Sequence, residues 1–178
     1  MTLYTIGHGT RTAQELIEAL QSFDVRLVAD VRAYPRSRTN PQFNEDVLRQ
    51  TVAQAGLAYE HWRSLGGRRR GQGDASPNDA WRHPAFRAYA DYMLEEAFLS
   101  ALDMLLTHAG HTVTAVMCSE TLWWRCHRRL IADAAIARGA QVLHIMRPGV
   151  AVPHQLPPFA HLVGDKVSYV ATAPSVRP

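Results

Sequence analysis

Cysteine, lysine and long apolar runs are all scarce in this sequence. Its 178 residues include two cysteines, Cys118 and Cys126, which excludes a disulfide-rich secreted scaffold. No run of about 18 apolar residues occurs, so a membrane-spanning helix is not expected. The first residues lack the basic and apolar regions of a signal peptide. These absences predict a cytoplasmic protein that has no membrane partner.

The positive charge of the chain comes almost entirely from arginine. The 19 basic residues outnumber 16 acidic ones, for a net charge of +3, and Lys166 is the single lysine. Arginine binds phosphate and carboxylate groups through two-point contacts, although a GC-rich genome also enriches arginine. Hydrophobic residues make up 47% of the chain and charged residues 20%, which is typical of a folded protein, and the length corresponds to one domain.

Segments typical of strands and helices alternate along the chain. Apolar and β-branched runs predict strands at residues 2–6, 26–31, 57–60, 112–117 and 141–145, with an edge strand at 167–170. Helices are predicted after the capping residues Thr12 and Asn44, from Pro84 through Leu106, and from about Leu122 to Gly139. The alternation predicts an α/β fold, a single three-layer domain with a mainly parallel sheet of about five strands flanked by helices.

One long irregular segment interrupts this pattern. The domain is expected to extend over residues 1–170, with a loop rich in glycine and arginine at residues 61–83. The triplet Arg68-Arg69-Arg70 in this loop suits either a mobile clamp on phosphates or a solvated surface. Residues 171–178 are predicted to form a loose C-terminal tail.

Polar residues follow three of the predicted strands. His8 comes after the first strand, Asp30 and Arg32 end the second, and Cys118 and Glu120 follow the fourth. In a parallel sheet the C-terminal ends of the strands share one edge, and ligands bind there. We therefore expect these side chains to face a common cleft.

The segment from Cys118 to Arg128 carries the most distinctive chemistry. Cys118 precedes a predicted helix, whose N-terminus favours a thiolate. Cys126 and His127 are expected to approach it, which suits a cysteine nucleophile with a histidine partner. A phosphatase-like loop would place an arginine six residues after the cysteine, but Trp124 is there.

Three other interpretations of these residues stay open. In the first, both cysteines are small core residues and His127 is a hydrogen-bonded core histidine. In the second, Cys118, Cys126, His127 and His8 bind a metal ion, although seven residues between the cysteines is not a zinc-finger spacing. In the third, the cysteines form a redox pair, although no CxxC motif is present. We predict no metal ion and no other cofactor.

Residues 30–38 form a second polar cluster. Asp30 suits either a base or a partner that holds Arg32 still. Arg32 and Arg38 suit the binding of phosphate, with a hydrogen bond from Ser37, and an internal salt bridge is the alternative. His8 lies in a Gly-His-Gly turn and suits a general acid or base near neutral pH, or a plain turn histidine.

Seven short motifs occur in order along the chain. They are Thr5-Ile-Gly-His8, Asp30-Val-Arg-x-x-Pro35-x-Ser-Arg38, Pro41-x-Phe43, Leu65-Gly-Gly67, Phe86-x-x-Tyr89-x-x-Tyr92-Met93, Met117-Cys-x-Glu120-x5-Cys126-His-Arg128 and Val142-x-His144-Ile145. This combination resembles the domain-of-unknown-function family 488, over about residues 3 to 170. The chain departs from the family pattern at Gly9, where serine is common, and at Trp123-Trp124, where the linker is usually charged. The resemblance implies an α/β fold and a prokaryotic cytoplasmic protein, and it implies no particular reaction.

One main hypothesis and two alternatives follow. The main hypothesis is an enzyme, a cysteine-dependent hydrolase or transferase, that acts on an anionic, phosphate-bearing substrate such as a nucleotide or nucleic acid. The predicted catalytic residues are Cys118 as nucleophile, His8 or His127 as proton carrier, and Glu120 and Asp30 as bases or orienting groups. The predicted substrate-binding residues are Arg32, Ser37, Arg38, Cys126 and Arg128. The alternatives are a non-catalytic nucleotide or nucleic-acid binding module and a structural or partner-binding domain.

Overall fold

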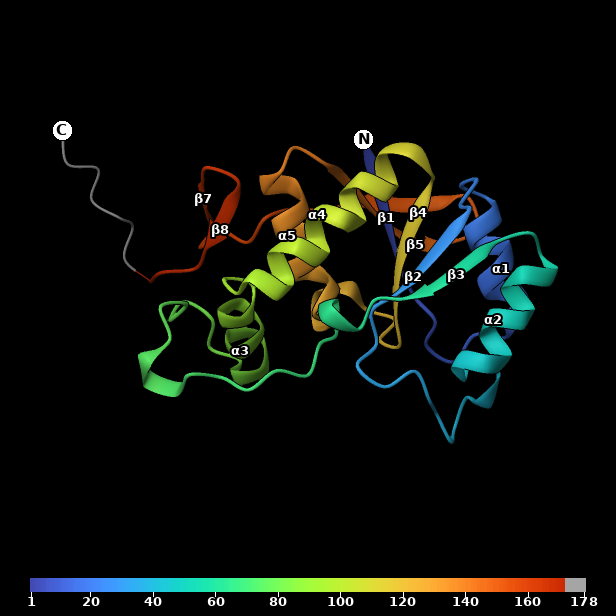
Figure 1. The fold of residues 1–178 in the computed structure, drawn as a ribbon, viewed down its shortest axis with the longest axis horizontal. Helices are drawn as coiled ribbons and strands as arrows, with labels where there is room; N and C mark the ends of the chain where they lie inside the picture. The colour runs from blue at the N-terminus through green and yellow to red at the C-terminus, as the bar shows by residue number, and fades with distance from the viewer. Residues whose placement is uncertain (172–178) are drawn as a thin grey trace.

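The fold is built on a six-stranded sheet, seen in a computed structural model that describes residues 1–171 (Figure 1). In sheet order the strands are β3 (Ala58–His61), β2 (Leu27–Asp30), β4 (Thr114–Cys118), β1 (Thr2–Gly7), β5 (Gln141–Arg147) and β6 (Val150–Pro153). The first five strands of this order are parallel, as predicted. The strand β6 adds an antiparallel edge beside β5, and no sequence pattern predicted it, because four residues ending in proline look like a loop.

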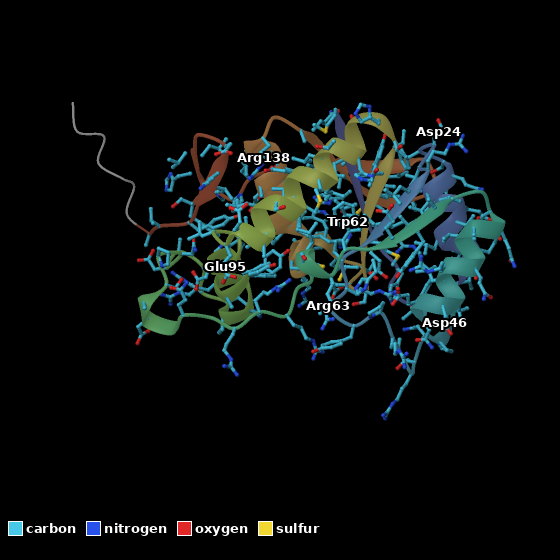
Figure 2. All side chains as sticks on the ribbon, in the orientation of Figure 1. Asp24, Asp46, Trp62, Arg63, Glu95 and Arg138 are labelled. Carbon is cyan, nitrogen blue, oxygen red and sulfur yellow. The ribbon has the colours of Figure 1, made fainter. Side chains whose placement is uncertain are left out.

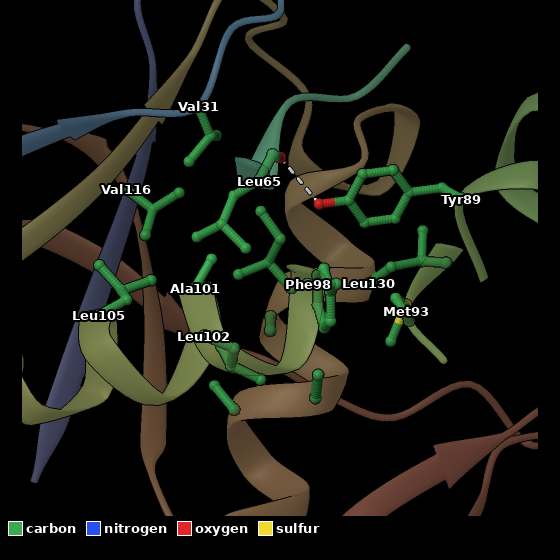
Figure 3. Packing of buried hydrophobic residues seen from close by; sticks show 14 of the residues in the cluster. Val31, Leu65, Tyr89, Met93, Phe98, Ala101, Leu102, Leu105, Val116 and Leu130 are labelled. Carbon is green, nitrogen blue, oxygen red and sulfur yellow. Dashed lines mark hydrogen bonds between the residues drawn. The ribbon is translucent and has the colours of Figure 1, made fainter. Parts of the chain in front are cut away.

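Helices cover both faces of the sheet. The helices α1 (Ala13–Gln21) and α2 (Glu45–Gln54) lie on one face, and α3 (Pro84–Tyr92), α4 (Glu96–His111) and α5 (Arg128–Ala137) lie on the other (Figure 1). Ile6 and Val28 belong to the core under α1 and α2, whereas Leu3 and Val116 belong to the core under α4 and α5. Figure 3 shows part of this second core, including Val116. The three-layer α/β fold predicted from the sequence is therefore confirmed.

The single helix predicted over residues 84–106 is two helices in the structure. The break falls at Glu95, whose backbone is extended (φ −82°, ψ 145°). Just before it, the buried carboxylate of Asp91 accepts hydrogen bonds from Ser76 Oγ at 2.5 Å and from Asn78 Nδ2 at 2.9 Å. We attribute the break to this attachment of α3 to the preceding loop. The apolar spacing continues across the break, so the sequence pattern conceals it.

The start of α5 also differs from the prediction of a helix from about Leu122. Residues Trp123–Arg125 form a single 3-10 turn, and Cys126 has an extended backbone (φ −121°, ψ 149°). The helix α5 begins only at Arg128. As a result Cys126, and not Cys118, stands next to the N-terminus of a helix.

The two predicted helix caps behave differently. Thr12 and Glu15 form the predicted capping box at the start of α1. Asn44 occupies the cap position of α2 but makes no capping hydrogen bond. Its Oδ1 instead accepts the backbone N–H of Ser37 at 2.8 Å. Asn44 therefore stabilises the loop that leads from β2 to α2.

The chain beyond β6 does not join the main sheet. The strands β7 (His161–Val163) and β8 (Lys166–Ser168) form a separate antiparallel hairpin, so the edge strand predicted at 167–170 pairs with β7 instead. The predicted loose tail falls, except for residue 171, outside the described residues. Of the helices in residues 1–171, none has the length and apolar character needed to cross a membrane. Charged side chains such as Asp24 and Asp46 lie on the outside of the molecule (Figure 2).

Candidate functional site

A cleft opens beyond the C-terminal ends of β1, β2 and β4. Its volume is about 670 Å³, and the loops that follow these three strands supply much of its lining. From the predicted set, its lining includes His8, Arg32, Ser37, Glu120, Cys126 and His127. This is the strand edge at which parallel α/β proteins bind ligands.

The cleft is rich in arginine. Arg36, Arg68 and Arg125 are exposed on its rim, and Arg32 lies deeper. Among the described residues that line it, Glu120 is the one acidic side chain, and its carboxylate accepts a backbone hydrogen bond from its own loop at 3.0 Å. A surplus of guanidinium groups suits an anionic ligand.

Asp30 and Arg32 form a buried ion pair beside the cleft. Arg32 Nη2 lies 2.6 Å from Asp30 Oδ2, and Arg32 Nε lies 2.9 Å from Asp30 Oδ1. The hydroxyl of Tyr59 donates to the same carboxylate at 2.6 Å, and Arg32 Nη1 donates to the carbonyl of Phe43 at 2.8 Å. Asp30 is fully buried and is not among the lining residues. This geometry favours the second of its two predicted roles, the holding of Arg32.

His8 is buried and neutral. Its Nδ1–H donates to the carbonyl of Gly9 at 2.9 Å, and its Nε2 lies 3.4 Å from Arg32 Nη1, which can only donate. Burial lowers the pKa of His8 to about 4. Its ring stacks on Phe43, with 4.1 Å between the ring centroids. At neutral pH this histidine is therefore a poor proton acceptor, in contrast to the role considered for it from sequence.

At Gly9, where the family commonly has serine, a neighbouring side chain fills the space that a Cβ would occupy. Gly9 has a φ of +54°, and a Cβ placed there would lie 2.1 Å from Thr121 Oγ1. A serine at this position would therefore require Thr121 to move. The Thr121 hydroxyl, from the loop after β4, occupies this part of the cleft lining in the present chain.

Cys126 lies beside a buried guanidinium group. Arg128 is 1% exposed, and its Nε donates to Cys126 Sγ at 3.4 Å. Its other N–H groups donate to Thr5 Oγ1 and to the backbone carbonyls of Glu120 and Thr121. Within residues 1–171 no carboxylate lies within salt-bridge distance of Arg128. Among these contacts Cys126 is the group that can carry a negative charge.

Hydrogen bonding and charge make Cys126 the more acidic of the two thiols. Burial on its own raises the pKa of Cys126, but the neighbouring thiol of Cys118 and the charge and hydrogen bond of Arg128 outweigh it and lower the pKa to about 6. The nearness of Cys126, together with burial, raises the pKa of Cys118 to about 12. Cys118 is also absent from the cleft lining. The geometry therefore favours Cys126 as the activated thiol, because its sulfur lies beside Arg128 and the start of α5, and the predicted nucleophilic role of Cys118 stays a prediction.

His127 directs one ring nitrogen at both sulfur atoms. Its Nε2 lies 3.1 Å from the carbonyl of Val31, which can only accept, so Nε2 carries the hydrogen. In the neutral ring Nδ1 then has a free lone pair. It lies 3.6 Å from Cys126 Sγ and 3.9 Å from Cys118 Sγ. His127 is therefore placed to exchange a proton with either thiol.

These three side chains also have the donor types that bind metal ions. The sulfur atoms of Cys118 and Cys126 and Nδ1 of His127 lie within 4.8 Å of one another. We do not assign them as ligands, because the buried guanidinium of Arg128 already donates to Cys126 and opposes a second cation there. His8, the fourth residue considered for a metal, directs its Nε2 at Arg32 instead.

The remaining residues predicted to bind substrate are dispersed. Ser37 lines the cleft, but its Oγ accepts the backbone N–H of Asn40 at 3.0 Å. Arg38 is exposed and does not line the cleft, whereas Arg36, which no sequence motif indicates, does. Arg128 is buried and does not line the cleft either. Of these positions, Arg36 is the one best placed to meet a ligand.

The three consecutive arginines of the long loop do not act as a unit. Arg68 lines the cleft. Arg69 donates to three backbone carbonyls of its own loop and stacks on Tyr92, at 3.6 Å from the ring centroid. Arg70 is exposed and lies outside the cleft lining. A ligand in the cleft therefore meets one of the three.

A buried chain of polar side chains runs from the site into the core, and no sequence pattern pointed to it. Arg128 Nη1 donates to Thr5 Oγ1 at 3.3 Å, and Thr5 Oγ1 lies 2.7 Å from His144 Nδ1. His144 Nε2 lies 2.9 Å from His154 Nδ1, and His154 Nε2 lies 2.6 Å from Asp133 Oδ1. With neutral rings, each hydrogen bond points from the arginine towards the carboxylate. Burial lowers the pKa of His144 to about 2, in agreement with a neutral ring.

Three members of this chain, Thr5, Arg128 and His144, stand in the sequence motifs, but nothing in the motifs indicates that they meet. The hydrogen-bonded pair Thr5 and His144 is 139 residues apart, so no local spacing relates them. The pairing of β1 with β5 brings them together, with Thr5 beside His144 in register.

Comparison with known proteins supports the family. Neither the curated proteins nor the solved structures give a significant match. The model of the family described as "Domain of unknown function DUF488" matches residues 12–135. The match includes the motifs around Asp30 and Cys126 and leaves His8 and His144 outside. This chain therefore belongs to the DUF488 family.

Proposed function

We propose that this protein is a cytoplasmic enzyme, a cysteine-dependent hydrolase or transferase, that acts on an anionic, phosphate-bearing substrate such as a nucleotide. The observation that carries the proposal is the position of Cys126, which lines a basic cleft and accepts a hydrogen bond from the buried guanidinium of Arg128. This arrangement supports a thiolate at neutral pH, which is the nucleophilic form of cysteine. A reducing cytoplasm keeps such thiols available.

The rim of the cleft supplies the binding groups for the anion. Arg36, Arg68 and Arg125 are exposed there, and each has a planar guanidinium that suits phosphate oxygens. Arg32 contributes positive charge from deeper in the cleft, but much of its hydrogen-bonding capacity is used by Asp30 and Phe43. We therefore assign substrate binding to the three rim arginines.

The reaction begins with a thiolate attack. An electron pair of Cys126 Sγ forms a bond to the electrophilic centre of the substrate, and the leaving group departs with its own bonding pair. His127 Nδ1, 3.6 Å from this sulfur, takes the thiol proton before the attack and passes it to the leaving group, and it then takes a proton from the water or acceptor that displaces Cys126. Water in a hydrolase, or a second acceptor in a transferase, then displaces Cys126 and regenerates the thiolate.

The other predicted residues have supporting roles in this scheme. His8 presents a neutral ring to the cleft, and Asp30 holds Arg32. Glu120 orders the loop after β4 through a backbone hydrogen bond at 3.0 Å. Its exposed carboxylate also repels anions, so a substrate is expected to bind on the arginine side of the cleft.

Protection of Cys126 by anions tests the proposal. Inorganic phosphate and pyrophosphate should slow the alkylation of Cys126 by iodoacetamide, measured by peptide mass spectrometry. Arg36→Ala and Arg125→Ala should weaken this protection, whereas Arg70→Ala is the matched control, because Arg70 is exposed outside the cleft. An absence of protection at low ionic strength, or an equal loss in all three variants, would count against an anion site beside Cys126.

A further inference from the structure

Cys118 has a position that the proposed reaction does not explain. It is 7% exposed, it is absent from the cleft lining, and its backbone carbonyl accepts the N–H of His8 at 2.9 Å. Its sulfur nevertheless lies close to the sulfur of Cys126. The two sulfurs and His127 Nδ1 all lie within 4.8 Å of one another. Both cysteines are free thiols.

We propose that Cys118 is a resolving thiol, which converts a Cys126 oxidised by a hydroperoxide into a reversible Cys118–Cys126 disulfide and so protects the site from irreversible oxidation. The inference rests on the proposed function in one respect, the thiolate at Cys126. It adds a reaction with a different co-substrate, a small hydroperoxide, and a role for the second cysteine.

The first step takes place at the cleft. Both cysteines are buried, with Cys126 4% and Cys118 7% exposed, but Cys126 lines the cleft and Cys118 does not, so we assign the attack on the hydroperoxide to Cys126. An electron pair of Sγ attacks the nearer peroxide oxygen, the O–O bond breaks, and the product is a sulfenic acid at Cys126. The other oxygen leaves as alkoxide or hydroxide with the bonding pair and is protonated by water. Sulfur is oxidised and the peroxide is reduced by two electrons.

The second step consumes the sulfenic acid. The sulfur of Cys118 attacks the sulfur of Cys126, an S–S bond forms, and the S–O bond breaks. The hydroxyl leaves with the bonding pair and combines with the Cys118 proton to give water. His127 Nδ1 lies 3.9 Å from Cys118 Sγ and is placed to carry that proton. No further oxidant is required.

The geometry allows this bond with side-chain movement. The two sulfurs are within 4.8 Å, whereas a disulfide is about 2.05 Å long. Cys118 is the last residue of β4 and is paired with Gly7 of β1. Cys126 is held by a backbone hydrogen bond to Trp123 at 3.1 Å and has an extended backbone that separates the 3-10 turn from α5. Rotation about the cysteine side-chain bonds is therefore the movement we expect.

The electrostatic surroundings suit different roles for the two thiols, with Cys126 as the thiol that is oxidised and Cys118 as the thiol that resolves it. The nearby thiolate of Cys126, together with burial, disfavours a second negative charge and raises the pKa of Cys118, so Cys118 stays protonated while Cys126 is a thiolate. Once Cys126 becomes a neutral sulfenic acid, that negative charge beside Cys118 no longer exists. The proton of Cys118 is then easier to remove, so Cys118 becomes nucleophilic only after Cys126 has been oxidised.

The test uses the full chain, fully reduced and then treated with hydrogen peroxide. Wild-type protein should become two hydrogen atoms lighter, with Cys118 and Cys126 joined in one peptide pair under non-reducing conditions. Dithiothreitol should restore both thiols. The Cys118→Ser variant should instead show a dimedone-reactive sulfenic acid at Cys126, followed by sulfinic acid that dithiothreitol does not reverse. The Cys126→Ser variant should leave Cys118 reduced under the same treatment.

Three results would overturn the inference. Wild-type protein could form sulfinic acid at Cys126 as fast as Cys118→Ser does, with no disulfide. Cys118 could be oxidised equally fast in Cys126→Ser. Tightly bound zinc, found by metal analysis of the reduced protein, could hold both thiols and block their oxidation. Alkylation of the reduced protein distinguishes these failures from a failure of the proposed function. An acidic thiolate at Cys126 that forms no disulfide would overturn the role of Cys118 and leave the proposed nucleophile intact.

Discussion

At the scale of single residues, Arg128 is the group that distinguishes the two cysteines. Its guanidinium is buried, donates to Cys126 Sγ at 3.4 Å and has no carboxylate within salt-bridge distance in residues 1–171. A buried positive charge stabilises a neighbouring anion more strongly than an exposed one, because water does not screen it. The thiolate of Cys126 and the guanidinium of Arg128 therefore stabilise each other.

Replacing Cys126 with serine should remove a pH dependence of stability. The pKa of Cys126 is lowered from 9.0 to about 6 in the folded protein, so between these pH values the unfolded chain binds more protons. The free energy of unfolding should therefore rise with pH across this window, by at most about 1.4 kcal/mol per pH unit, and this contribution is lost as pH falls through 6. Urea unfolding of wild type and Cys126→Ser between pH 6 and 9 measures the difference. Parallel curves for the two proteins would show that Cys126 is not a thiolate.

The residues of the site could be predicted from sequence better than their roles. The motif placed Cys118, Cys126, His127 and Arg128 in one cluster, and the structure brings them together. Which cysteine is acidic depends on where α5 begins, and helix starts are set by a few backbone angles that apolar spacing does not encode. The role of Asp30 depends on Tyr59, which lies 29 residues away.

At the scale of elements, the buried polar chain and Tyr169 connect α5 with β1, β5 and the segments after β6 and β8. Asp133 on α5 accepts from His154 Nε2 and from the hydroxyl of Tyr169, each at 2.6 Å. His154 in turn is linked through His144 and Thr5 to the strands that support the site. Loss of one member leaves buried polar groups without partners, which costs more than the net value of a single hydrogen bond.

Two substitutions at Asp133's partners should therefore differ in cost. His154→Ala leaves two buried groups, the Asp133 carboxylate and His144 Nε2, each without a hydrogen-bond partner, and at about 1–3 kcal/mol for each group it should lower the free energy of unfolding by about 3–5 kcal/mol. Tyr169→Phe removes one hydroxyl and keeps the ring, so about 1–3 kcal/mol is expected. Chemical denaturation at pH 7 measures both. A cost for His154→Ala below that of Tyr169→Phe would mean that Asp133 is not the charged end of the chain.

The elements themselves could be predicted where a local pattern decides them. Alternation of apolar runs and amphipathic segments was enough for the five parallel strands, and Thr12 with Glu15 was enough for the start of α1. The other features of the fold depend on contacts between residues that are distant in sequence. In the predicted long helix, Asp91 is held by a loop just before the break at Glu95, and β6 lies paired with β5.

At the scale of the whole molecule, the net positive charge is small, and part of the arginine run is used inside its own loop. The net charge is only +3, and the hydrogen bonds of Arg69 are made within its own loop. Loop residues 65–67 are in turn anchored, since the hydroxyl of Tyr89 donates to the Leu65 carbonyl at 2.8 Å (Figure 3). The run of three arginines therefore presents less positive surface to nucleic acid than the number of its charges indicates.

The salt dependence of binding separates a pocket from a nucleic-acid module. A module that neutralises phosphates along a duplex loses affinity with a log–log slope of about −0.9 per contact. We predict weak duplex DNA binding that changes little in Arg70→Ala, while Arg68→Ala weakens the protection of Cys126 by pyrophosphate. Fluorescence anisotropy with a labelled duplex across a salt series provides the measurement. Tight binding with a steep slope that Arg70→Ala reduces would favour the module instead.

The most direct test of the central claim is the alkylation rate of each cysteine as a function of pH. Intact folded protein is treated with iodoacetamide from pH 5 to 9, and the two cysteine peptides are quantified separately. The account predicts that Cys126 reacts faster at every pH, with a midpoint near 6, and that Cys118 stays largely unlabelled. Faster labelling of Cys118, or no labelling of either thiol until the protein unfolds, would contradict it.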